Sequence, residues 1–216
     1  MSFAARPIGL VKGEFVFVDV ITSDVTNYNL RARAVAAGWD QVVPLVATTT
    51  VNSGIVLSAD STSQYAFDTG VTFPAGTTLA LINNGFVIGM GGAGGAVYTA
   101  GSNGGPALRA QYAISIDAAG GVIGGGGGGR SGRTDAAGAG GGASGTFSSG
   151  GSGGGGGGAG GTTGPGDDDP RAGGGGGWGA SGGTAGIYAG GTGGAAVVGN
   201  SYITWINTGT RYGAIT

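Results

Sequence analysis

The chain has 216 residues, of which 57 are glycine, and charged residues make up only 9% of it. It contains no cysteine and no histidine, which excludes disulfides, Cys/His zinc sites, and Ser-His-Asp or Cys-His catalytic groups. The net charge of −2 at pH 7 argues against electrostatic binding to nucleic acid or to an anionic membrane. We therefore expect a protein that is not an enzyme and that uses no cofactor or metal.

The N-terminal residues lack the basic head and apolar stretch of a signal peptide. The longest strongly apolar run, Phe15–Ile21, is interrupted by Asp19. Because a membrane helix needs ~20 apolar residues, we expect no membrane insertion.

The first 76 residues have the pattern of a small β-rich module. Glu14–Ile21 is dense in β-branched and aromatic residues, which are typical of strands. Turn residues separate the further apolar runs that we expect to be strands, which are Val42–Val51, Gly54–Ala59, Tyr65–Phe67, Val71–Phe73 and Thr77–Ile82.

One short helix is expected in this module, at Tyr28–Ala37. Asn27 or Thr26 is suited to cap its start, and Gly38 stands where a C-terminal stop is expected. Trp39 follows at once, and we interpret it as a core or docking anchor rather than a ligand platform.

A weak repeat follows the module, at residues 81–92, 116–127 and 205–213. In each copy an apolar segment enters a turn that contains Asn or Asp together with Gly, and a short segment returns. Asn and Gly accept the positive φ angles of tight turns, so we expect three β hairpins, the last of which closes the chain.

Glycine is concentrated after these first 88 residues. Residues 1–88 hold seven glycines, residues 89–199 hold 48 and the last 17 residues hold two. One interpretation is a flexible Gly/Ser linker, because glycine loses the most entropy on ordering. The other is a bundle of glycine helices of the polyproline-II type, with three residues per turn and a rise of ~3.1 Å per residue.

The layout favours the folded bundle. Short glycine runs at 124–129, 153–158, 173–177 and 190–194 alternate with stretches that carry most of the bulky and charged residues. A linker would also have no reason to end in the apolar strand that begins at Ser201. We therefore expect a mostly β and irregular fold, with a β-rich domain at 1–76 and a glycine-helix domain at 77–216 that is closed by a strand at 201–213.

The order of these features resembles the adhesins at the tips of T-even-type bacteriophage tail fibres. The similarity lies in the segment Ile82–Gly92, in the succession of glycine motifs, and in the closing strand Tyr202–Tyr212, and it covers about residues 77–216. Residues 1–76 resemble the attachment region of other small tail-tip proteins. The resemblance implies a polyglycine-II bundle in layers, at the distal tail tip of the virion.

The resemblance also implies two kinds of partner. Loops between the glycine helices would bind an outer-membrane protein or a surface polysaccharide of a bacterium, and the N-terminal part would dock on the tail or its fibre. We take as candidate docking residues Phe15, Phe17, Tyr28 and Trp39.

Glycine offers no side chains, so recognition must lie in the segments between the glycine runs. Aromatic residues and arginine dominate binding hot spots. The candidates for receptor contact are Arg130, Arg133, Asp135, Phe147, Asp168, Arg171, Trp178, Ile187 and Tyr188. Trp178 and Tyr188 would equally serve to cap the bundle.

The remaining signals are weak. GxGxxG patterns recur, but in a tract that is half glycine they do not indicate a dinucleotide site. Asp167–Asp169 would offer oxygen ligands to Ca²⁺, although three adjacent acids in a Gly/Pro turn are more typical of a solvated loop. The leading hypothesis is a phage tail-tip adhesin, and the alternatives are an ice-binding protein and a purely structural tail or coat protein.

Overall fold

The structure is a computed structural model, and it describes residues 6–11, 13–96, 99–129, 131, 175–184 and 188–216. Its strands form three sheets. The first sheet has the order β1 (Arg6–Val11), β2 (Glu14–Ile21), β5 (Leu45–Val51), β8 (Thr78–Asn83), β11 (Ile114–Asp117) and β14 (Ile203–Asn207). The second has the order β3 (Val25–Thr26), β6 (Val56–Ser58), β9 (Phe86–Ile88), β12 (Val122–Gly124) and β15 (Thr210–Tyr212). The third has the order β4 (Tyr28–Asn29), β7 (Phe67–Asp68), β10 (Leu108–Arg109) and β13 (Val197–Val198).

The chain visits these sheets in a fixed rotation, so it winds as a three-sided β-helix. Each coil contributes one strand to the first, second and third sheet in turn, and the strands of successive coils pair in parallel. The exception is β1, which pairs antiparallel with β2. In the last coil, β14 and β15 are followed by a bridge between Ile215 and Val197.

Alternation along the strands places one set of side chains inside the coil. In β5, for example, the odd-numbered residues from Leu45 to Val51 are buried, and the residues between them are half-buried. The strand register then places apolar residues next to apolar residues of the neighbouring strands. One such row, which crosses four strands, consists of Phe17, Ala47, Leu79 and Ile114. The core therefore consists of ladders of apolar residues that run from coil to coil.

The expected strands are mostly present. β2 has the predicted bounds, and β5, β6 and β8 lie within or one residue beyond the predicted runs. The run at Tyr65–Phe67 is shifted, since β7 is Phe67–Asp68. Val71–Phe73 forms no strand, because it belongs to the connection that links the third sheet back to the first.

The predicted helix is present but shorter than expected. Helix α1 (Leu30–Ala36) begins after Asn29, whose side-chain oxygen accepts a 2.8 Å hydrogen bond from the Ala32 amide. The cap is therefore Asn29 rather than Asn27 or Thr26, because Tyr28 and Asn29 are recruited into the third sheet as β4. Gly38 ends the helix with φ +104°, in the left-handed region that favours glycine.

The three expected hairpins are wrong. β8 and β9 lie in different sheets, and so do β11 and β12, and β14 and β15. Each repeat is instead the corner between the first and second sheets. Asn83, fully buried, makes the first of these corners: its amide nitrogen donates to the Val122 carbonyl (3.2 Å) and its oxygen accepts from the Gly85 amide (3.1 Å).

The boundary expected near residue 76 falls in the connection between β7 and β8, and the first sheet continues on both sides of it. β5 pairs with β8 along six residue pairs, from Val46 with Thr78 to Val51 with Asn83. The buried core likewise continues from Phe17 to Val197. The described residues on both sides of position 76 therefore share one β-helix.

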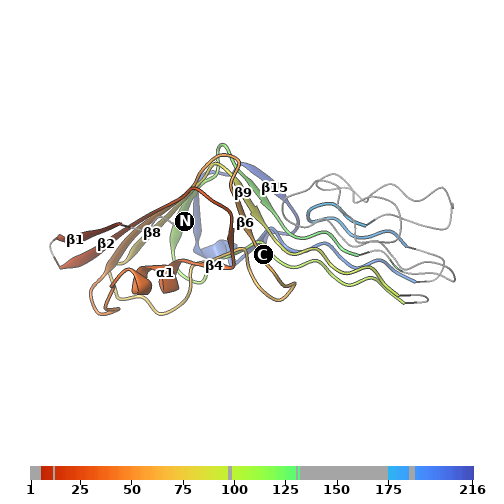
Figure 1. Ribbon diagram of the computed structural model, residues 1–216, viewed down its shortest axis with the longest axis horizontal. Coiled ribbons are helices and arrows are strands. Elements are labelled where there is room, and N and C mark those ends of the chain that lie inside the picture. The colour runs from red at the N-terminus through yellow and green to blue at the C-terminus, as the bar shows by residue number, and fades with distance from the viewer. Residues whose placement is uncertain (1–5, 12, 97–98, 130, 132–174, 185–187) are drawn as a thin grey trace.

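The glycine-rich sequence enters this β-helix as two long excursions at one corner. Residues 89–107 connect β9 to β10, and residues 125–196 connect β12 to β13, so both leave between the second and third sheets of adjacent coils. Figure 1 shows the described parts of these segments running side by side away from the sheets, on the side of the molecule opposite helix α1.

Backbone hydrogen bonds join the two excursions. Within the segment 125–129, Gly126 and Gly129 donate to Gly105 and Ser102 of the first excursion, at 2.8 Å each. The amides of Gly125 and Gly128 donate to residues outside the first excursion. A Cβ added to Gly125 would lie 2.0 Å from the Gly194 carbonyl oxygen, and one added to Gly128 would lie 1.9 Å from the Gly191 carbonyl oxygen. Equivalent contacts thus recur at every third residue.

We predict that Asn83→Ala lowers the free energy of unfolding by about 2–3 kcal/mol, because the buried Gly85 amide and the half-buried Val122 carbonyl lose their partners. The neighbouring residue Asn84 is exposed and provides the control: Asn84→Ala should change the free energy of unfolding by about 0.5 kcal/mol or less. Chemical denaturation of both variants measures the difference. Equal stability of the two variants would contradict the corner role of Asn83.

We also predict that Gly126→Ala destabilises the fold by about 3 kcal/mol or more, because no side chain fits at this backbone contact. The added Cβ would lie 1.8 Å from the Met90 carbonyl oxygen. Gly120→Ala is the matched control, since its Cβ meets nothing closer than the Asn84 Oδ1 at 3.4 Å. Thermal melts that show the same loss for both variants would rule out this packing.

Candidate functional site

Most of the predicted receptor-contact residues lie outside the described residues. They are Arg130, Arg133, Asp135, Phe147, Asp168, Arg171 and Ile187. The acidic run Asp167–Asp169 lies outside as well. Their role as receptor contacts stays a prediction.

Trp178 is described, and it is buried with 5% exposure. Its ring lies 6.0 Å from that of Phe86 in β9 and 6.2 Å from that of Tyr212 in β15, both in tilted geometry. A Cβ on Gly124 of β12 would come within 3.1 Å of the Trp178 Cβ. Trp178 therefore anchors a glycine-rich segment on the second sheet, whereas Tyr188 is half-buried.

The predicted docking aromatics are largely internal. Phe17, Tyr28 and Trp39 are at most 2% exposed, and Phe15 is half-buried against the core. The Tyr28 ring stacks on Phe67 at 5.5 Å. These three buried rings stabilise the first coils and offer no surface to a partner in this structure. Parallel strands turn Phe17 and Tyr28 into the coil, and Trp39 is buried in the connection after helix α1, where it stacks on Phe73.

A buried polar cluster accompanies Tyr28. Its hydroxyl donates to the Asp19 carboxylate (3.0 Å) and lies 3.0 Å from the Thr49 hydroxyl. Burial and the nearby carboxylate raise the pKa of Tyr28, so it stays neutral well into the alkaline range. The Arg33 guanidinium lies over the Tyr28 ring and 3.5 Å from Asp19.

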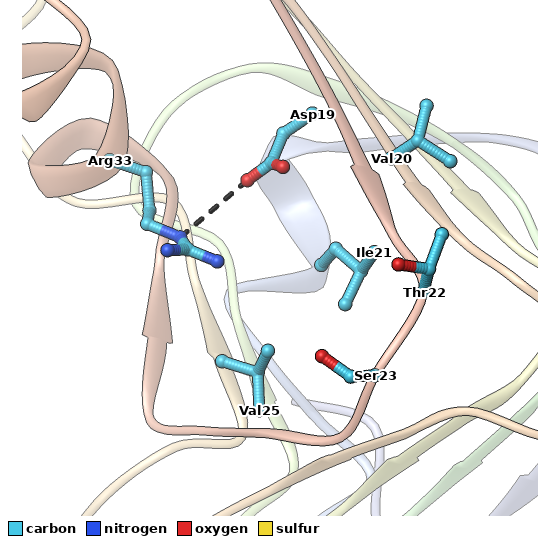
Figure 2. A pocket seen from close by; sticks show the side chains of 7 residues that line it. All are labelled: Asp19, Val20, Ile21, Thr22, Ser23, Val25 and Arg33. Atoms are coloured by element: carbon cyan, nitrogen blue, oxygen red, sulfur yellow. Dashed lines mark ion pairs between the residues drawn. The ribbon is translucent and has the colours of Figure 1, made fainter. Parts of the chain in front are cut away.

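Figure 2 shows the small pocket beside this cluster, with Arg33 and Asp19 facing each other across it. Its lining residues are Asp19, Val20, Ile21, Thr22, Ser23, Val25 and Arg33. The carboxylate is already engaged by Tyr28 and Arg33. The arrangement thus serves to neutralise a buried charge between β2 and helix α1.

A second polar ladder covers the third sheet. Asn29, Asp68 and Arg109 are in register on neighbouring strands. Arg109 binds both Asp68 oxygens (3.2 and 2.6 Å), and Asn29 donates to the same carboxylate (3.1 Å). The guanidinium also lies 4.3 Å from the centre of the Tyr65 ring. The hydrogen bonds and charge of Asp68 raise the pKa of Arg109. Together, Asn29, Asp68 and Arg109 tie three coils to one another.

Sequence reasoning missed three exposed apolar residues in the connections between the third and first sheets. They are Val42, Val71 and Tyr202, with exposures of 76%, 49% and 50%. The available signal was weak: each stands among turn residues, as in Asp68-Thr-Gly-Val-Thr72, where an apolar side chain has no regular element to bury it.

Two features are absent from the described residues. They contain no cluster of three or more metal-ligating side chains. No helix among them has the length and hydropathy that crossing a bilayer requires.

Comparison with known proteins gives a family for the chain. A profile of the family described as "Phage tail fibre adhesin Gp38" matches residues 16–216. No curated protein matches the chain.

A similar solved structure is described as the gp37-gp38 adhesin tip complex of the bacteriophage S16 long tail fiber. The TM-score is 0.66 at 24% sequence identity, over 92% of this chain and 82% of that one, so it supports the fold. The expected resemblance to tail fibre adhesins is thus confirmed: the chain belongs to the phage tail fibre adhesin Gp38 family.

Proposed function

We propose that this adhesin attaches to a tail fibre through its β-helix and binds a receptor on the host surface through the glycine-rich excursions. The observation that carries the proposal is their placement. Both excursions leave from one corner and run away from the sheets, while helix α1 lies on the opposite side (Figure 1). One end is thereby free for the host and the other for the virion.

We also infer that the excursions form a bundle of polyglycine-II helices. The support is the period of three in their contacts. A Cβ on Gly126 would clash with the Met90 carbonyl oxygen, and one on Gly129 with the Ala93 carbonyl oxygen. One on Gly127 would clash with the Gly176 carbonyl oxygen, on a different neighbouring segment. A helix with three residues per turn directs each third residue to the same neighbour, which gives this pattern.

Such a bundle is rigid but carries few side chains for recognition. Its peptide groups are used in bonds such as Gly194 to Gly126 (2.7 Å) and Gly92 to Gly127 (2.8 Å). Recognition of an outer-membrane protein or a surface polysaccharide would therefore depend on the stretches between the glycine runs. The candidates remain Arg130, Arg133, Asp135, Phe147, Asp168, Arg171, Ile187 and Tyr188.

The fibre partner is supported by the related structure, whose description names a complex of gp37 with gp38. The chain aligns with 82% of that related chain. We therefore expect a fibre protein of the same phage to hold the β-helix of this chain.

We predict that exchanging the stretches 130–139, 143–149 and 162–172 for those of an adhesin with another host changes adsorption. Binding of the purified chain to its original host cells should fall by about tenfold or more, because hot-spot contacts are lost. Exchange of the exposed residues Thr22 and Ser23 in the β-helix is the control and should leave binding unchanged.

Cell-binding assays with labelled chain, together with phage adsorption, provide the measurement. If all three exchanges leave the host range unaltered, the glycine-rich excursions are structural and the receptor-binding proposal fails.

A further inference from the structure

Four connections link the third sheet back to the first, one in each coil. They are residues 30–44, which include helix α1, and residues 69–77, 110–113 and 199–202. Because successive coils stack, these connections lie one above the other along one edge of the β-helix. We call this edge the connection face. In Figure 1, α1 marks it in the half of the molecule that lies away from the glycine-rich excursions.

The connection face presents apolar side chains to solvent. Three of its four connections contain an exposed large apolar residue: Val42, Val71 and Tyr202. In the remaining connection Tyr112 is half-buried. Scattered apolar residues are ordinary on a surface, but here three of the four stacked connections carry one, and we call these residues the apolar strip.

The loops that carry Val42 and Val71 are tied together. The Arg31 side chain donates from Nη2 to the Gln41 side-chain oxygen and from Nε to the Thr72 carbonyl (3.4 Å). Asp40 Oδ1 accepts from the amides of Val42 (2.9 Å) and Val43 (3.2 Å), and these bonds lower the pKa of its carboxyl. The exposed valines are thus held in fixed positions.

Both loops also contain strained backbone next to the exposed valine. Gln41 has φ +66° and Thr72 has φ +63°, in the left-handed region that non-glycine residues avoid. Strain of this kind persists where the surroundings impose it, often at binding surfaces.

An aromatic platform underlies the strip. Trp39 stacks on Phe73 at 5.7 Å, and Phe73 contacts Tyr112 at 4.8 Å, so the rings span three coils. The Trp39 indole donates to the Val43 carbonyl (2.8 Å), which fixes the loop on the platform. An apolar partner would therefore meet a preorganised surface that loses little entropy on binding.

We propose that the connection face is the surface on which the tail fibre protein docks, with Val42 and Val71 at its centre. This rests on the proposed attachment to a fibre. It follows from geometry: if the excursions point to the host, the fibre must approach from the opposite end, and the apolar strip lies there. The fibre protein would contribute an apolar tip that excludes water from the two valines.

The test uses the full chain and the distal fibre protein of the same phage. Val42→Asp and Val71→Asp each introduce a charge on the strip. Their controls, Ile206→Asp and Val20→Asp, change residues of similar exposure, 61% and 49%, on the outer face of the first sheet. Affinity for the fibre protein is measured by calorimetry, binding to host cells in parallel, and folding by thermal melts.

We expect the two strip variants to bind the fibre protein about tenfold more weakly or worse, and the controls to stay within about twofold of the unaltered chain. All four should bind host cells like the unaltered chain. Normal fibre binding by Val42→Asp and Val71→Asp, or loss in the controls instead, would overturn the assignment of this face. Loss of host-cell binding together with fibre binding would overturn it too. An unaltered chain that binds no fibre protein would refute the proposed attachment itself.

Discussion

The fold depends on the pairing of backbone hydrogen-bonding groups between neighbouring passes of the chain. In the three sheets this pairing occurs between strands of successive coils, such as β2 with β5 and β5 with β8. In the excursions it occurs between extended glycine segments, where the Gly179 amide donates to the Gly125 carbonyl at 2.7 Å. Buried peptide groups must find partners in both regions, and only the space left for side chains differs.

That difference explains the composition. A strand in a sheet keeps its side chains above and below the hydrogen-bonding plane, so β5 accommodates Leu45 and Val51. A segment that contacts neighbours on several sides has no such free direction. Around Gly126 and Gly127, a Cβ would lie within 2 Å of a carbonyl oxygen. The excess of glycine follows from this close approach rather than from flexibility.

The sequence allowed part of this fold to be predicted. Strand β2 and the Gly38 stop were readable because local propensity and backbone conformation agree there. The corner at Asn83 was predicted as a hairpin, because Asn and Gly serve any tight turn. A hairpin and a corner of the β-helix differ in the residue to which the turn side chain is bonded. Asn83 bonds to Val122, which is 39 residues away in the next coil.

The functional surfaces were harder to predict for the same reason. Tyr28 and Trp39 were natural candidates for docking, since aromatic residues are frequent in interfaces, but stacking of coils buries them. Val42 and Val71 stand in turn sequences, and only the register of the coils places their loops together through Arg31. In a solenoid, the neighbours in other coils decide whether a side chain is exposed. The local sequence pattern around a residue holds no information about those neighbours.

The same stacking accounts for how the two proposed binding ends can coexist in one small chain. Both excursions are rooted at one corner, where Trp178 contacts Phe86 and Tyr212 and the Gly125 amide donates to the Tyr212 carbonyl (2.9 Å). These contacts fix the excursions to the second sheet. The connection face lies beyond them, at the opposite edge. Changes in the stretches between glycine runs therefore leave the aromatic platform of Trp39, Phe73 and Tyr112 untouched, and the two ends can vary independently.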